Sequence, residues 1–498
     1  MTDKAPKTLV KSGARLSGNG SLRSLFNFLR ERRWLLVALL VGAILFFIPP
    51  PEGLSEEGKR ALIMTLMAVI LFVTEPVPLP SVALMIIVGQ VLFLGRATAD
   101  VAESLMSDSV LFIMGSLMLA VAIVKQKLDK RLAYLIVSMT GPKTLNIAVG
   151  IALISGLMAS VIGEHTVAAM MLPVALTLIT LAKEDGKSIR GVAAILLLSI
   201  SYGCSIAGIG TPSGGARNVI MIGYWREFFY DPLSPESGRY LISYFRWVMY
   251  AYPIFLIQLP FLTFVLFRVF KPEKSDLSRA VVKLREQIAA EGPMRSRDWV
   301  AISVFVFTLI GWIGFSQNIG LGVVALTGAI AFLVMGLTRW EDMNTGVNWG
   351  VVLLYAAAIS LGVEMKDSGA AEWVASSLLA FLSPIGVDSG PPLWLTIAGL
   401  TTLVTNTMSN GAAVAVLGPI TLDMAASAGE SPIRLGFITA ISSSFAYFTV
   451  VATPACMIVY SSGYLKTRDF LRVGYRMAII SLFFLMIAAM FYWPLIGL

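Results

Sequence analysis

Apolar residues dominate this chain in long runs, and polar residues come in short stretches between them. A helix needs about 20 mostly apolar residues to cross the hydrocarbon core of a bilayer, and several runs here are shorter than that. Backbone that does not cross as a complete helix must be buried in protein or line a water-filled cavity. The pattern therefore predicts an all-α polytopic membrane protein with about 11 transmembrane helices, and re-entrant hairpins or broken helices where the runs are short.

The same polar interruption occurs twice inside apolar runs. A small or polar triplet precedes a proline by ten residues, at 163–165 before Pro173 and at 409–411 before Pro419. Paired interruptions of this kind are typical of secondary transporters, whose ligands bind where broken helices expose backbone near the bilayer midplane. The sequence therefore favours a transport function.

Each triplet is followed by a Thr-Pro break, at 210–212 in the first half and at 452–454 in the second. The chain thus contains two comparable units, and each begins with a similar apolar segment. We expect five segments: a basic tail at 1–33, lead-in helices at 34–107, a first unit at 108–268, a linker at 269–298 and a second unit at 299–498.

Composition and charge exclude several classes of protein. With 57% hydrophobic and 14% charged residues, the chain is not a soluble globule, in which about a quarter of residues are charged. The net charge of +8 comes from lysines and arginines that border apolar runs, chiefly at 1–33 and 271–298. The positive-inside rule places both segments in the cytoplasm. We therefore expect a multi-pass protein of a bacterial-type plasma membrane with a cytoplasmic N-terminus and no nucleic-acid partner.

Cysteine and histidine are scarce. Cys204 and Cys456 both lie in apolar segments, which argues against a disulfide framework or a metal site and favours small buried residues. His165 is the single histidine. An integral-membrane enzyme using Glu164, His165, Ser409 and Cys456 can be imagined, but nothing in the sequence pairs a base with an orienting partner. A duplicated site suits a carrier better than an enzyme. A channel is a third possibility, which concentrative uptake dependent on an ion gradient would separate from a carrier.

Several segments together resemble one family. They are 73–80, the two triplets with their spacing, 205–212 and 444–464. In these segments the chain is similar to the divalent anion/sodium symporters, the sodium-coupled carriers of succinate, citrate and sulfate. The resemblance implies two inverted repeats, a scaffold domain that forms a homodimer, and a transport domain that moves as an elevator. It also implies a site between two hairpin tips, each bearing a Ser-Asn-Thr triplet, beside two unwound loops.

The resemblance carries specific residues onto this chain. For the anion, such as a C4-dicarboxylate or sulfate, it implies Glu164, His165, Thr166, Thr211, Ser409, Asn410, Gly411, Thr453 and Pro454. For sodium, it implies positions near Gly163, Glu164, Gly208, Gly210, Ser409, Asn410, Ala452 and Thr453. Hydroxyls, amides and helix-end N–H groups suit an anion, and unwound carbonyl groups suit a hard cation.

The chain departs from the family pattern at both tips. Glu164 and His165 replace Asn and Thr in the first triplet, and Gly411 replaces Thr in the second. An ionised Glu164 would repel an anionic substrate. Three explanations stay open. Glu164 is protonated and the carrier is proton-coupled or an exchanger, His165 is cationic and either offsets Glu164 or holds the anion directly, or Glu164 is a fixed negative ligand that retains or replaces a sodium ion. The pair could also cap a helix end and face away from the site.

Other polar residues near the breaks have simpler interpretations. Thr211 and Thr453 could bond only to nearby backbone. Arg217 follows the first break and could contact an anion, but a snorkelling arginine at the membrane interface would look the same in sequence. Arg217 is therefore only a weak candidate for the site.

Overall fold

The structure, a computed structural model, describes residues 32–126, 140–183, 188–279, 281, 282, 286 and 294–498. Within these ranges the chain is helical, and one isolated bridge between Lys143 and Asp276 is the only extended pairing. The expected basic tail at 1–33 lies almost wholly outside the described residues, and the expected linker at 269–298 lies partly outside them. The expected division into five segments stays a prediction.

Eight helices in the described ranges are long and apolar enough to cross a membrane. They are α6 (Asp108–Lys125), α8 (Thr144–Ile162), α9 (Glu164–Ala182), α10 (Arg190–Ala207), α12 (Tyr244–Val269), α14 (Ser296–Ile319), α17 (Trp349–Asp367), and α23 with its continuation (Thr467–Leu495). The prediction of an all-α polytopic membrane protein is confirmed. The total of about 11 crossings depends on which shorter helices also span the bilayer.

The remaining helices are shorter, less apolar or more charged. The apolar ones are α2 (Arg33–Phe47), α4 (Leu79–Leu92), α15 (Leu321–Val334), α18 (Ala370–Leu382) and α21 (Pro432–Ser442). The others are α3 (Glu56–Thr74), α5 (Thr98–Ser104), α11 (Ala216–Phe229), α16 (Trp340–Gly346), α19 (Gly390–Thr405), α20 (Asn410–Ser427), α22 (Pro454–Tyr460) and α24 (Trp493–Leu495), with short helical turns at 212–214, 235–240, 383–385 and 488–492. The proline-rich stretch at 73–80 separates α3 from α4, because proline cannot continue a helix interior.

Both predicted triplets lie at the junction of two consecutive helices. Gly163 alone separates α8 from α9, and its φ of 86° is a conformation that L side chains rarely adopt. In the second unit, residues 406–409 separate α19 from α20, and Ser409 caps α20 by accepting a hydrogen bond from Ala412 N–H at 3.3 Å. Helices α8 and α9 contact each other, as do α19 and α20. Two helical hairpins therefore carry the triplets at their tips.

The Thr-Pro motifs mark two breaks in helices. Helix α10 ends at Ala207 and α11 begins at Ala216, whereas α21 ends at Ser442 and α22 begins at Pro454. In both breaks the threonine caps the next turn, because Thr211 accepts a hydrogen bond from Gly214 N–H at 3.1 Å and Thr453 accepts one from Cys456 N–H at 3.2 Å. The predicted broken helices are present at the predicted positions.

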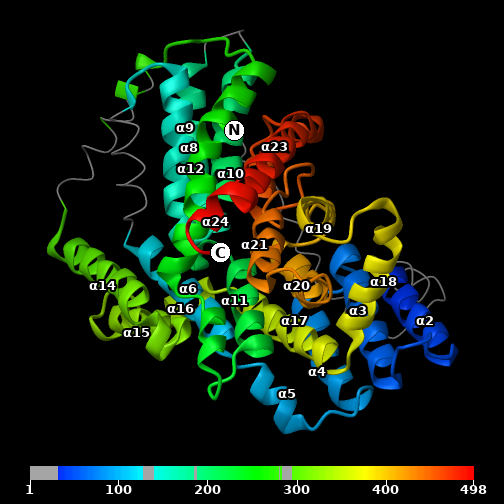
Figure 1. Cartoon of the computed structure of the whole chain (residues 1–498). Coiled ribbons are helices and arrows are strands. Elements are labelled where there is room, and N and C mark those ends of the chain that lie inside the picture. Colours follow the sequence, from blue (N-terminus) through cyan, green and yellow to red (C-terminus); the bar gives the residue numbers. More distant parts are fainter. Residues whose placement is uncertain (1–31, 127–139, 184–187, 280, 283–285, 287–293) are drawn as a thin grey trace, which may run out of the picture.

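Helices from the two halves of the chain pack crosswise around the breaks. Helix α9 of the first hairpin contacts α22, which follows the second break, and α20 of the second hairpin contacts α11, which follows the first break. Helices α8, α9, α10 and α12 pack together as one group, whereas α17 and α20 contact each other in a neighbouring group (Figure 1). This crossing brings both tips and both breaks to the middle of the molecule.

A stability prediction follows from the contact between α8 and α10. The backbone of α8 passes so close to Gly203 that an added Cβ would lie 2.7 Å from the carbonyl oxygen of Ala152. Gly203→Ala should therefore force the helices apart and destabilise the protein by about 1–3 kcal/mol, as overpacked cores are. A lowered midpoint of thermal unfolding in detergent would show this. Gly399→Ala is the matched control, because nothing lies within 4 Å of that Cβ position in α19; equal unfolding midpoints for the two variants would contradict the prediction.

Candidate functional site

A cavity of about 730 Å³ lies where the two tips meet. Its lining combines both triplets, the end of the first break, the start of α22, and faces of α6 and α17. The predicted residues that line it are Gly163, Glu164, His165, Thr166, Ser409, Asn410, Gly411, Ala452 and Pro454. Segments from both halves of the chain therefore share one cavity, as the family resemblance implies.

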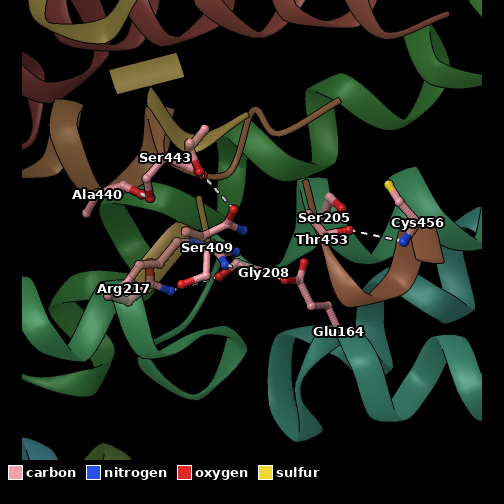
Figure 2. A network of polar contacts seen from close by, with 12 residues as sticks. Glu164, Ser205, Gly208, Arg217, Ser409, Ala440, Ser443, Thr453 and Cys456 are labelled. Atoms are coloured by element: carbon pink, nitrogen blue, oxygen red, sulfur yellow. Dashed lines mark hydrogen bonds and ion pairs between the residues drawn. The ribbon is translucent and has the colours of Figure 1, made fainter. Parts of the chain in front are cut away.

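Arg217 lies at the centre of this region. It is the second residue of α11 and only 2% exposed, so the interpretation as a snorkelling arginine at the membrane interface is wrong. Its Nη1 lies 3.9 Å from Oε1 of Glu164, which is itself 9% exposed. Figure 2 shows Glu164 and Arg217 approaching this central region from different helices. A buried arginine therefore joins the first tip to the first break.

The second tip also contacts Arg217. With its amide oriented so that the oxygen faces Arg217, Asn410 accepts a hydrogen bond from Nη1 at 3.1 Å. In this orientation the Asn410 nitrogen donates to Thr405 Oγ1 at 2.8 Å. The Thr405 hydroxyl donates in turn to the carbonyl oxygen of Ser443, in the second break, at 2.6 Å. One guanidinium group therefore contacts both tips, and Nε and Nη2 of Arg217 have no hydrogen-bond partner.

Two asparagines fix the unwound backbone at the breaks. Asn218 donates to the carbonyl oxygens of Gly208 at 2.8 Å and Thr211 at 2.7 Å. Asn406 has the same role in the second half, because it donates to Phe445 O at 3.1 Å and accepts from Phe448 N–H at 2.8 Å. These bonds satisfy buried backbone groups that no helix satisfies. They hold both breaks in place beside the cavity.

The packing around position 411 explains why this residue is a glycine. The ring of Tyr355, from α17, occupies the space where a Cβ at position 411 would lie, and Tyr355 also lines the cavity. A threonine, as in the family triplet, would overlap this ring. The departure from the family pattern at the second tip is therefore matched by an aromatic side chain on a neighbouring helix.

Some of the predicted site residues do not line the cavity. The hydroxyl of Thr211 donates to the carbonyl oxygen of Ser160 in α8, and neither Thr211 nor Thr453 lines the cavity. Gly208 and Gly210 also lie outside the lining. At Gly208 an added Cβ would overlap Nη2 of Arg217, so this glycine makes room for the guanidinium. The binding roles of these four residues stay predictions.

The first tip faces the cavity. Glu164 and His165 both line it, so Glu164 does not face away as a simple helix cap would. Arg217 forms an ion pair with the Glu164 carboxylate, and the role of His165 stays a prediction. As the first residue of α9, Glu164 also interacts favourably with the positive end of the helix dipole.

An ion pair lies at another part of the lining. Lys125 Nζ, at the end of α6, is 2.6 Å from Oδ1 of Asp342 in α16, and the Lys125 side chain is half exposed. The hydrogen bond from Lys125 lowers the pKa of Asp342, so this carboxyl group is ionised at neutral pH. The pair adds no net charge to the cavity.

The sequence did not identify Tyr355, Asn406 or Asn218 as site residues, and it made Arg217 only a weak candidate. Tyr355 lies in an apolar stretch of α17 and carries no local signal. Arg217 and Asn218 follow the first break directly, and an arginine inside a region of such low charge is itself a signal of function. Among the described residues no cluster of three or more His, Cys, Asp or Glu could hold a metal ion.

The chain is similar to known transporters over nearly its whole length. The family model described as the sodium:sulfate symporter transmembrane region matches residues 30–498. A protein of Haemophilus influenzae named as an uncharacterized transporter is 27% identical over 461 residues, which cover 89% of this chain and 94% of that protein. The sodium-dependent dicarboxylate transporter SdcS of Staphylococcus saprophyticus is 24% identical, over 92% of this chain and 91% of its own.

Two solved structures share the fold. MtrF of Neisseria gonorrhoeae, described as one of a class of antimetabolite efflux pumps, superposes with a TM-score of 0.54 at 13% identity and covers 93% of this chain and 94% of its own. The YdaH transporter of Alcanivorax borkumensis superposes with a TM-score of 0.53 at 15% identity, covering 95% and 98%. At these identities the likeness concerns the fold alone.

Proposed function

Because this chain belongs to the sodium:sulfate symporter family, whose model spans residues 30–498, we propose that it is a sodium-coupled symporter of a small divalent anion. Membership makes the chain a secondary transporter and not an enzyme. The proposed substrate is a C4-dicarboxylate or sulfate. SdcS, a relative over nine-tenths of the chain, is named a sodium-dependent dicarboxylate transporter, which favours the dicarboxylate.

One observation carries the proposal for the anion. Both hairpin tips open into a single cavity, and a buried arginine contacts both of them. Guanidinium groups bind carboxylates and sulfate-like oxyanions through parallel N–H donors. Ser409 and the first N–H groups of α20 offer further donors at the same place. We therefore assign the anion to the space between the tips, next to Arg217.

Buried oxygen atoms near the breaks support a cation site. Oδ1 of Asn218 and Oγ of Ser444 are each buried without a hydrogen-bond partner. A hard cation such as sodium prefers oxygen ligands, and the unwound backbone supplies carbonyl groups as well. We propose that sodium binds beside the tips, on residues that flank the breaks.

The named relatives favour sodium over a proton as the coupling ion, because SdcS is named a sodium-dependent transporter. A proton-coupled or exchange mechanism with Glu164 as the titrating group requires a neutral carboxyl group for part of the cycle, and that form would break the ion pair with Arg217. Proton coupling is therefore the second candidate, and it is separated from the first by ion replacement.

Replacing sodium by choline should abolish concentrative uptake of the substrate into proteoliposomes, because choline is a bulky organic cation that cannot occupy a sodium site built from oxygen ligands. The measurement is uptake of radiolabelled succinate and of sulfate, each with an inward sodium gradient, with choline and in protein-free vesicles. Undiminished uptake in choline that requires an inward proton gradient would overturn sodium coupling and support the second candidate.

The substrate can be identified without a transport assay. A ligand that binds only the folded state raises its stability by about 2.7 kcal/mol at a concentration of 100 times Kd. Thermal unfolding with C4-dicarboxylates, citrate and sulfate, each with and without sodium, would report substrate and coupling ion together.

We further propose a cytoplasmic N-terminus, a homodimer and location in a bacterial-type inner membrane.

A further inference from the structure

The charges inside the cavity cancel when no ligand is bound. Glu164 and Arg217 face each other at 3.9 Å, and both are at least nine-tenths buried. Lys125 and Asp342 are the other lysine, arginine, aspartate and glutamate side chains of the described lining, and they pair with each other. The empty site therefore carries no net fixed charge besides any on His165.

The absence of net charge in the empty site affects the step in which a carrier returns that site to the starting side. A carrier that accumulates substrate must return its empty site to the starting side, through a state in which water reaches the site from neither side. Charges in such an occluded state are separated from bulk water, and a lone ion there is strongly disfavoured unless it is paired. A site with an unpaired Arg217 would therefore return slowly or not at all.

The contact between the two side chains is close enough to pair the charges and loose enough to be replaced. At 3.9 Å it is an ion pair without a direct hydrogen bond, and Oε2 of Glu164 has no partner. The two groups come from different elements, Glu164 from the first turn of α9 and Arg217 from the first turn of α11 (Figure 2). A bound oxyanion can thus take over Arg217 without breaking a hydrogen bond of Glu164.

We propose that Glu164 is the internal counter-ion of Arg217 in the empty carrier, and that a substrate oxyanion takes its place on binding. This inference rests on the proposed transport function and adds a role for Glu164 that is distinct from substrate binding. Glu164 allows the empty site to return, so the protein performs net uptake. Without this carboxylate the protein would exchange one anion for another, because only the loaded site would cross.

The test compares two transport modes of the same variant in proteoliposomes. Net uptake of labelled succinate is measured into vesicles that contain no anion substrate, and exchange is measured into vesicles loaded with unlabelled succinate. Glu164→Gln should lower net uptake at least about tenfold, since it leaves a buried charge unpaired, while exchange persists. A parallel loss of both modes, or no change in either, would overturn the inference.

Glu227→Gln is the matched control. Glu227 lies on the same helix as Arg217 but is exposed, so the same chemical change there should leave both modes as in the wild type. Sulfate replaces succinate in both assays if the wild type transports only sulfate. A wild type that moves neither anion would count against the proposed function and not against the role of Glu164.

A measurement without substrate tests the role of Glu164 separately from the proposed transport function. Ala216 lines the cavity beside Arg217, so Ala216→Cys, in a chain with Cys204→Ala and Cys456→Ala, reports access to the empty site. A membrane-impermeant thiol reagent should label it from both sides of oriented vesicles when Glu164 is present. Adding Glu164→Gln should confine labelling to one side. Labelling from both sides at unchanged rates in that variant would overturn the inference.

Discussion

Replacing Arg217 with glutamine is expected to abolish transport of every substrate that the wild-type protein carries. The variant removes the charge that contacts both hairpin tips and leaves the Glu164 carboxylate buried without a partner. Removing one partner of a buried, hydrogen-bonded charge pair in a complex typically costs about 2–5 kcal/mol of binding free energy. Since each 1.4 kcal/mol is about tenfold in affinity, the apparent affinity for the anion should fall at least about twentyfold.

The measurement is initial uptake as a function of succinate or sulfate concentration in proteoliposomes. Arg226→Gln is the matched control, because Arg226 lies on the same helix with a half-exposed side chain. Arg217→Lys should recover only part of the activity, since an ammonium group cannot present the paired donors of a guanidinium. Uptake by Arg217→Gln at the level of the Arg226→Gln control would show that the arginine does not bind the anion.

Restoring the family's threonine at the second tip is expected to inactivate this protein. In Gly411→Thr the new side chain would overlap the ring of Tyr355, which touches the backbone of the tip. Either the ring or the tip must move, and shifts of this kind in a packed interior typically cost about 1–3 kcal/mol. Because Asn410 precedes Gly411 directly, the shift should also displace its amide from Arg217. We expect uptake to fall at least about tenfold.

A second substitution tests whether overlap with Tyr355 causes the loss of uptake in Gly411→Thr. Tyr355→Ala combined with Gly411→Thr removes the overlap and should recover uptake above the level of Gly411→Thr alone. The interaction of the two substitutions, measured as a double-mutant cycle, should therefore be strongly favourable. Gly399→Thr is the control for a threonine on the second hairpin, because nothing lies within 4 Å of the Cβ position there. Wild-type uptake by Gly411→Thr would contradict this account of the tip.

Much of the fold could be predicted from local features of the sequence. The length and apolarity of the runs indicated the membrane class, and a triplet ten residues before a proline located both hairpin tips. The Thr-Pro motifs located the breaks, where Thr211 and Thr453 cap the following turns. These features are predictable because a proline, a capping threonine or a glycine with positive φ acts on its own neighbours along the chain.

The candidate site was predicted only in outline. The triplet residues do share a cavity, as expected, but Thr211 and Thr453 turn their hydroxyl groups toward nearby backbone. Arg217, which the sequence left as a weak candidate, lies between both tips. Local sequence could not distinguish a buried arginine from one at the membrane surface, because both follow the same kind of break.

The sequence by itself therefore determined the class of the protein and the positions of its paired helix interruptions. Only the tertiary structure decided which charges and rings face each other. Glu164 pairs with Arg217, and Gly411 makes room for Tyr355, through the crosswise packing of helices from the two halves of the chain. Hydrophobic length and helix breaks depend on neighbours in the chain, whereas the pairing of a buried charge depends on what the fold places beside it.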